Sequence, residues 1–334
     1  MLGKILLTAV NAVAPIVLLI ALGYLLKRTG LLNKPFLEVG NKLVFRIFLP
    51  AMLFLNIYSI PSLGQIRWDL VGYCLIVITV VFLAGWLVSR SATKDLTRRG
   101  VIWQCTFRSN FAIIGLPLAT SLGGDAGAAV AAVLSAFTIP MYNVYSVIAL
   151  SVYTGQKKSP ASVAKSIITN PLTYSVAIGL LALLVRFLQV ELFGRVVFSL
   201  ERDLKFLYKT LDNLKALASP LALIVLGGES EFSAVRGMLK EISVSVFSRV
   251  VAAPMIAVSG ALVLDAFGYM PCGKGELAGI IALFGSPVAV SSAIMAGNMK
   301  NDLQLATQLV IWTSVASVVT IFGTVCVLMA AGFL

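Results

Sequence analysis

Apolar residues in this chain form long continuous runs that are separated by short polar connections. A helix that crosses about 30 Å of hydrocarbon needs about 20 mostly apolar residues. Measured against that length, the sequence predicts ten membrane-spanning helices and an all-α polytopic membrane protein. The predicted spans are Ile5–Leu26, Phe36–Tyr58, Leu70–Val88, Gly100–Leu122, Ala126–Tyr153, Ile167–Leu188, Leu211–Gly228, Ile242–Phe267, Leu277–Gly297 and Leu303–Phe333.

Composition agrees with the membrane interpretation. Of the 334 residues, 59% are hydrophobic and 12% are charged, whereas soluble proteins average about 45–50% apolar and about 25% charged residues. This excess excludes an ordinary cytoplasmic enzyme and a disordered chain. The formal net charge is +12. Because the basic residues lie between apolar runs, membrane topology explains them, and no nucleic-acid partner is expected.

Basic residues are divided unequally between the two sides of the membrane. Thirteen lie in the connections that follow the first, third, fifth, seventh and ninth spans, and seven lie on the opposite side. The positive-inside rule therefore predicts that the larger set is cytoplasmic and that both termini are outside. The larger set is Lys27, Arg28, Lys34, Arg90, Lys94, Arg98, Arg99, Lys157, Lys158, Lys165, Arg236, Lys240 and Lys300.

The residues needed for several kinds of chemistry are missing. The sequence contains no histidine, which excludes Ser–His and Cys–His catalysis and histidine-ligated metals. Its four cysteines form no Cys-x-x-Cys pair and are interpreted as small residues that fill the core. We therefore expect no enzyme activity, no metal site and no cofactor.

Proline spacing indicates an internal repeat. Pro50 and Pro117 are 67 residues apart, and so are Pro220 and Pro287. Together with the count of five spans in each half, this spacing predicts a first repeat over 1–155, a second over 156–334, and opposite insertion of the two copies. Each copy carries Gly-x-Pro in its fourth span. We expect helix breaks there, at Ile113–Pro117 and Phe284–Pro287.

Three parts of the sequence resemble one known family. They are the N-terminal part that includes Leu22-Gly23-Tyr24-Leu25 and Leu49-Pro50-Ala51, the run from Arg108 to Pro117, and the later Asn170-Pro171, Ser219-Pro220-Leu221 and Ser286-Pro287-Val288. In these the chain resembles the auxin efflux carrier family, in its bacterial branch of malonate- and malate-permease-like transporters. The resemblance covers nearly the whole chain.

The resemblance implies both a fold and a function. The implied fold has ten helices in two inverted five-helix repeats and is shared with bile-acid symporters and sodium/proton antiporters. Helices 1, 2, 6 and 7 form a scaffold, and helices 4 and 9 are broken and cross at their prolines. The implied function is alternating-access transport of a small organic carboxylate across a bacterial inner membrane. The sequence leaves open whether the chain forms a homodimer.

The predicted spans contain basic residues, among them Lys42, Arg46, Arg108 and Arg249, at positions where charge is costly and commonly functional. Arg108 is expected either to attract the substrate carboxylate or to reach the cytoplasmic surface. Arg46 is a weaker site candidate, together with the nearby Pro50. Lys42 is expected to reach the surface, and Arg249 is expected to be structural.

Polar residues near the two predicted breaks complete the candidate site. The resemblance places Asn110 at the crossing, in contact with the substrate, although an amide also serves as a link between helices. The other substrate-binding candidates are Gly115, Pro117, Asn143, Ser286, Pro287 and Ser291.

No acidic residue lies in the middle of a predicted span, which disfavours a carboxylate proton relay. The coupling ion, sodium or proton, stays open. A sodium-coupled symporter for a larger organic anion is the nearest alternative, and an intramembrane enzyme or a channel is more distant. The charged segment near 190–210 is predicted to form an amphipathic helix on the membrane surface that runs into the seventh span.

Overall fold

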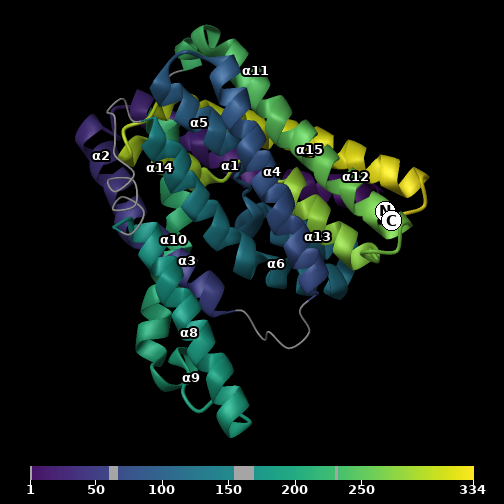
Figure 1. The fold of residues 1–334 in the computed structure, drawn as a ribbon. Helices are drawn as coiled ribbons and strands as arrows, with labels where there is room; N and C mark the ends of the chain where they lie inside the picture. The colour runs from purple at the N-terminus through teal and green to yellow at the C-terminus, as the bar shows by residue number, and fades with distance from the viewer. Residues whose placement is uncertain (1, 60–66, 154–168, 230–231) are drawn as a thin grey trace.

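The computed structural model describes residues 2–59, 67–153, 169–229 and 232–334, and within these ranges the protein is helical without a named strand (Figure 1). The predicted boundary at 155/156 lies outside the described residues. The α-helices are α1 (Leu2–Arg28), α2 (Lys34–Leu43), α3 (Leu49–Tyr58), α4 (Trp68–Ala92), α5 (Leu96–Phe107), α6 (Leu116–Val152), α8 (Pro171–Phe193), α9 (Leu200–Asp203), α10 (Lys205–Glu229), α11 (Leu239–Phe247), α12 (Ala253–Ala266), α13 (Lys274–Gly285), α14 (Val290–Asn298) and α15 (Leu303–Ala330). The π turns η1 (Val44–Phe48), η2 (Phe111–Gly115) and η4 (Ser248–Ala252) and the 3₁₀ helix η3 (Phe232–Met238) connect some of them.

Seven helical stretches in the described part of the chain are long and apolar enough to cross a membrane. The protein is therefore a multi-pass membrane protein. Two of the predicted spans are split: Gly100–Leu122 is divided between α5 and η2–α6, and Leu277–Gly297 is divided between α13 and α14. The seven stretches are Lys34–Tyr58, Trp68–Ala92, Phe111–Val152, Pro171–Phe193, Lys205–Glu229, Val235–Ala266 and Leu303–Ala330.

Three prolines follow π turns instead of breaking their helices. Pro50, Pro117 and Pro254 each occupy the start of an α-helix directly after η1, η2 or η4. Proline lacks an N–H group and collides with the carbonyl four residues earlier, and the wider π turn removes that conflict. The expected break at Ile113–Pro117 is therefore wrong, because these residues belong to η2 and the start of α6.

The break in this segment lies earlier, at Arg108–Asn110, between α5 and η2. The second break, at Ser286–Ala289, does contain the predicted Pro287. Equal proline spacing therefore does not mean equal local conformation. Within α6 the chain turns sharply at Gly124, whose φ of +60° suits glycine. This turn separates the predicted fourth and fifth spans.

The helices pack in two groups, and α1 of the first group also packs against α15 of the second. The first group contains α1, α2, α3, α8 and α10, with α1 and α3 packed against α10. The second group contains α4, α5, α6 and α11 to α15, with α13 packed against α6. In the first group, glycines allow α1 and α10 to approach closely. A methyl group on Gly23 would collide with the carbonyl of Ile224, and a methyl group on Gly227 would collide with the carbonyl of Ile20.

The predicted amphipathic helix near 190–210 is formed only from Lys205 onward, where α10 begins and runs on through the predicted seventh span. Helix α8 ends at Gly194, which has a left-handed φ of 66°, and only the single turn α9 follows before α10. Ser199 and Asp203 close that turn reciprocally: the Ser199 hydroxyl accepts from the Arg202 N–H, and the Ser199 N–H donates to the Asp203 carboxylate. The periodic leucines from Leu207 onward belong to α10 itself.

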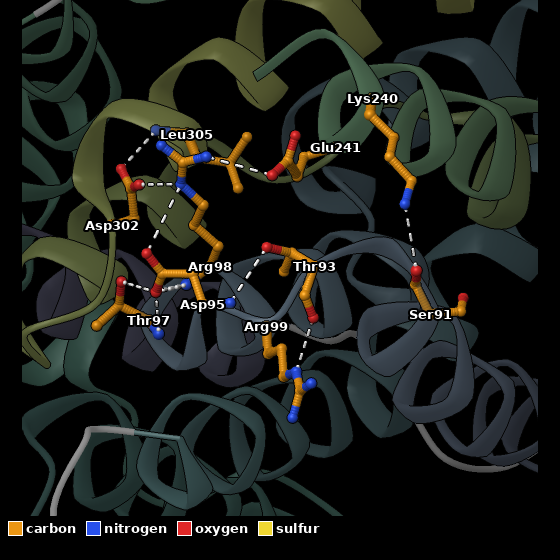
Figure 2. Close-up of polar contacts among 10 residues, drawn as sticks. All are labelled: Ser91, Thr93, Asp95, Thr97, Arg98, Arg99, Lys240, Glu241, Asp302 and Leu305. Atoms are coloured by element: carbon orange, nitrogen blue, oxygen red, sulfur yellow. Dashed lines mark hydrogen bonds and ion pairs between the residues drawn. The ribbon is translucent and has the colours of Figure 1, made fainter. Parts of the chain in front are cut away.

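An ion-pair cluster joins three helices of the second group at one end (Figure 2). Arg98 of α5 lies 3.0 Å from Asp302 and 3.2 Å from Glu241. Asp302 also caps α15, because its carboxylate accepts from the Leu305 N–H at 2.9 Å. The cluster thereby fixes the start of α5 against α11 and α15.

Replacing Gly227 by alanine is predicted to destabilise the protein by about 1–3 kcal/mol, because the added methyl group forces α1 and α10 apart. Thermal unfolding in detergent measures this effect. Gly323→Ala is the matched control, since a methyl group there meets no atom within 4 Å. Equal unfolding midpoints for the two variants would contradict the close packing.

Replacing Arg98 by alanine is predicted to cost about 1–3 kcal/mol, because it leaves the half-buried Glu241 and Asp302 without their cation. Arg99→Ala, which removes a hydrogen bond to the Thr93 carbonyl, is the control and is expected to cost less. Thermal unfolding of both variants tests the prediction, and the reverse order of stability would refute it.

Candidate functional site

The two helix breaks meet and pair through their backbones. Ser109 and Val288 form an antiparallel bridge, and the Asn110 N–H donates to the Pro287 carbonyl at 2.8 Å. Arg108 and Ser286 are both extended where α5 and α13 end. Each break therefore satisfies part of the polar backbone of the other at a buried place in the protein.

The four helix ends at the paired breaks differ in polarity. We call the place where the two breaks pair the crossing. Helices α5 and α13 end there with their C-terminal ends, whereas η2–α6 and α14 begin there with their N-terminal ends. The N-terminal ends carry free N–H groups and partial positive charge. Two residues from the start of each departing helix, Ala112 and Ile113 from η2 and Val290 and Ser291 from α14, line the same cavity.

This cavity, which we call the crossing cavity, has a volume of about 40 Å³ and lies between the two helix groups. At about 10–15 Å³ for each water molecule, it holds about three waters or a group of similar size. From the first group it is lined by Leu49, Met52, Leu53, Ala218, Ser219 and Ala222. From the second it is lined by Arg108, Ser109, Asn110, Ala112, Ile113, Ile139, Tyr142, Asn143, Ala289, Val290 and Ser291.

Arg108 provides the fixed charge in the wall of this cavity. Its side chain is 4% exposed and is held by neutral partners. Nη1 donates to the Ser146 hydroxyl at 2.6 Å, and Nη2 donates to Asn143 Oδ1 and to the Ser291 hydroxyl, both at 2.9 Å. None of the ion pairs in the described ranges includes Arg108. The guanidinium therefore keeps an unneutralised positive charge.

Four lining residues also present buried polar atoms that have no hydrogen-bond partner among the described residues. These atoms are Arg108 Nε, Ser109 Oγ, Asn110 Nδ2 and Tyr142 Oη. Each can donate a hydrogen bond. Unsatisfied buried polar atoms are costly, so a donor-rich wall without a carboxylate favours an occupant that accepts hydrogen bonds and carries negative charge.

A second cavity of about 200 Å³ adjoins the first and shares Ala112 and Ile139 with it. It reaches Asn56 and Ser59, at the end of α3. Toward the start of α2 the two helix groups are instead linked: Asn298 donates to Asn41 at 2.5 Å, and the Gln304 amide donates to the Glu229 carbonyl. The crossing cavity therefore adjoins open space toward the end of α3.

The structure brings together four of the predicted site residues: Arg108, Asn110, Asn143 and Ser291 line the crossing cavity. The others lie elsewhere. Pro287 contributes its carbonyl to the crossing, and the Ser286 hydroxyl donates to the Ala282 carbonyl at 2.6 Å.

The remaining four predicted residues are outside the cavity wall. Gly115 lies in η2, where an added methyl group would meet the Phe111 ring, and Pro117 starts α6. Arg46 is exposed on η1, and Pro50 is half-buried at the start of α3.

Sequence reasoning missed Ser109, Tyr142 and Ser146. Ser109 stands between Arg108 and Asn110, which the sequence does predict for the site, so its position in the chain is a usable signal. One face of α6 carries Tyr142, Asn143 and Ser146 at helical spacing. This spacing links Tyr142 and Ser146 to the predicted Asn143. Nothing in the pattern indicated that this face meets Arg108.

Arg249 of η4 lies on the other side of the crossing, among the helix C-terminal ends. It is fully buried, and its guanidinium donates to the carbonyls of Phe107 and Ser286 at 3.1 and 3.0 Å. The prediction of a structural arginine agrees with these contacts.

Comparison with known proteins identifies the family. A family model described as a membrane transport protein matches residues 8–325, which is nearly the whole chain and includes both breaks and the crossing cavity. No curated protein matches the sequence. The chain therefore belongs to the membrane transport protein family, the family of the auxin efflux carriers.

Proposed function

We propose that this membrane transporter carries a small organic carboxylate by alternating access, and that the substrate binds in the crossing cavity. One observation carries the proposal: the charged Arg108 and buried, unpartnered donors on three further residues line a cavity whose lining contains no acidic residue. A carboxylate supplies both the charge and the acceptors that this wall lacks.

The departing helix ends add to the attraction. The N-terminal ends of η2–α6 and α14 contribute partial positive charge from two sides of the crossing. Asn110 connects the two effects, since its backbone N–H pairs with Pro287 and its amide lines the cavity. In this proposal Arg108 attracts and orients the carboxylate, and Asn110, Ser109 and Tyr142 donate to its oxygens.

The fold in this proposal has ten spans in two inverted five-helix repeats, over 1–155 and 156–334. The split segments α5 with η2–α6 and α13 with α14 provide the fourth and ninth spans. Transport then follows from movement of the second helix group against the first. The contacts of Asn298 with Asn41 and of Gln304 with Glu229 close the cytoplasmic end and separate when that end opens.

Asn110→Asp is predicted to abolish carboxylate uptake into liposomes while it leaves the thermal unfolding midpoint unchanged or higher. The variant keeps the shape of the side chain but places a negative charge among the donors, where Arg108 stabilises it. Uptake of labelled small dicarboxylates at the wild-type rate would contradict the proposed site.

Arg108→Met is predicted to weaken substrate binding by about thirtyfold or more, because loss of one partner of a buried, charge-assisted pair costs about 2–5 kcal/mol. The control is Arg46→Met, which removes an exposed arginine outside the cavity wall and is expected to bind as the wild type does. Calorimetric measurement of dicarboxylate binding by the two purified variants shows which of these arginines contributes to substrate binding.

A further inference from the structure

Arg249 is surrounded by backbone carbonyl groups. The side chain has no exposed surface, and its three nitrogens make five hydrogen bonds to carbonyl oxygens. These bonds are Nε to Ser286 at 3.0 Å, Nη1 to Phe107 at 3.1 Å, and Nη2 to Leu283 at 3.2 Å, Phe284 at 3.1 Å and Ser286 at 2.9 Å.

These carbonyls belong to the C-terminal ends of α5 and α13, where helices leave acceptors unpaired. The reason is visible in α13. The residue four positions after Leu283 is Pro287, which has no N–H group. The residue four positions after Phe284 is Val288, whose N–H donates to the Thr313 hydroxyl at 3.2 Å. Both carbonyls therefore need another donor, and Arg249 provides it.

No carboxylate balances this arginine in the described ranges, where the ion pairs do not include Arg249. Its positive charge is instead stabilised by the partial negative charge of two helix C-terminal ends. In secondary transporters, unwound carbonyls and the C-terminal ends of half-helices are the groups that coordinate a sodium ion. A guanidinium occupies such a place here.

We propose that Arg249 is a tethered cation, which permanently occupies a cation site at the crossing and makes a bound sodium ion unnecessary there. This inference rests on the proposed carboxylate transport only where it concerns coupling. It assigns the two buried arginines separate tasks: Arg249 neutralises the helix C-terminal ends, and Arg108 faces the substrate from the side of the N-terminal ends. Carboxylate transport is then independent of the sodium gradient.

Thermal unfolding of the purified full chain tests the site without requiring transport. Arg249→Ala empties the carbonyl cluster, so its midpoint is expected to lie below that of the wild type. Millimolar guanidinium chloride, or sodium chloride compared with choline chloride at equal ionic strength, is expected to raise that midpoint by about 2 °C or more. The wild type and the Arg46→Ala control are expected not to gain stability from these cations.

A second pair of variants covers the case in which Arg249→Ala does not fold. Arg249→Lys keeps a cation with three donors, and Arg249→Met keeps the length of the side chain without charge or donors. The lysine variant is expected to be the more stable of the two, and only the methionine variant is expected to respond to added cations. Equal stability of the two, or a sodium-specific rise in the wild type, overturns the proposal.

Transport separates this inference from the proposed function. Uptake of a labelled dicarboxylate by wild-type liposomes is expected to be the same with and without an inward sodium gradient. Uptake driven by the sodium gradient overturns the tethered cation and leaves the carboxylate site in place. Absence of uptake for every carboxylate tested contradicts the proposed function, while the unfolding series still decides the role of Arg249.

Discussion

The backbone pairing of Ser109 with Val288, and of Asn110 with Pro287, is the contact on which the rest of the site depends. An interrupted helix leaves N–H and carbonyl groups that hydrocarbon cannot satisfy. Here each interruption satisfies part of the backbone N–H and carbonyl groups of the other. The helices that end or begin at the two interruptions therefore meet at the crossing. The polar cavity and the buried arginines are consequences of that arrangement.

Two C-terminal and two N-terminal helix ends meet at the crossing, and the side chains beside the two kinds of end differ. The C-terminal ends of α5 and α13 receive Arg249, which makes all of its hydrogen bonds to their carbonyls. The N-terminal ends of η2–α6 and α14 face the crossing cavity beside Arg108, whose own partners are neutral. The positive potential on the cavity side is therefore not balanced by any acidic residue in the cavity lining.

Apolar run length was sufficient to predict where most helices lie, because crossing a bilayer imposes one length on every span. The predicted Leu70–Val88 lies within α4, and Leu303–Phe333 largely coincides with α15. Proline was a less reliable guide. A break was correct at Pro287 but not at Pro117, because a preceding π turn absorbs the missing hydrogen bond at Pro117.

Arg108 was predictable from its charge inside an apolar span, and Asn110 was predictable from the family resemblance. Residues that reach the cavity only through packing, such as Tyr142, gave no such signal. The charged segment before α10 was misinterpreted because its periodic leucines belong to two separate helices, which are divided at Leu204. Periodicity alone does not report a local change of backbone direction.

Cross-linking measures the central contact most directly. In a chain whose native cysteines are replaced, Ser109→Cys and Val288→Cys together place two thiols on an antiparallel bridge, where Cα atoms are about 4.5–5.5 Å apart and within reach of a disulfide. Mild oxidation is predicted to link residues 109 and 288 within one chain, as a mass shift of the joined peptides, and to leave each single-cysteine variant unlinked. A folded double variant that stays reduced under the same oxidation would show that the two breaks do not meet.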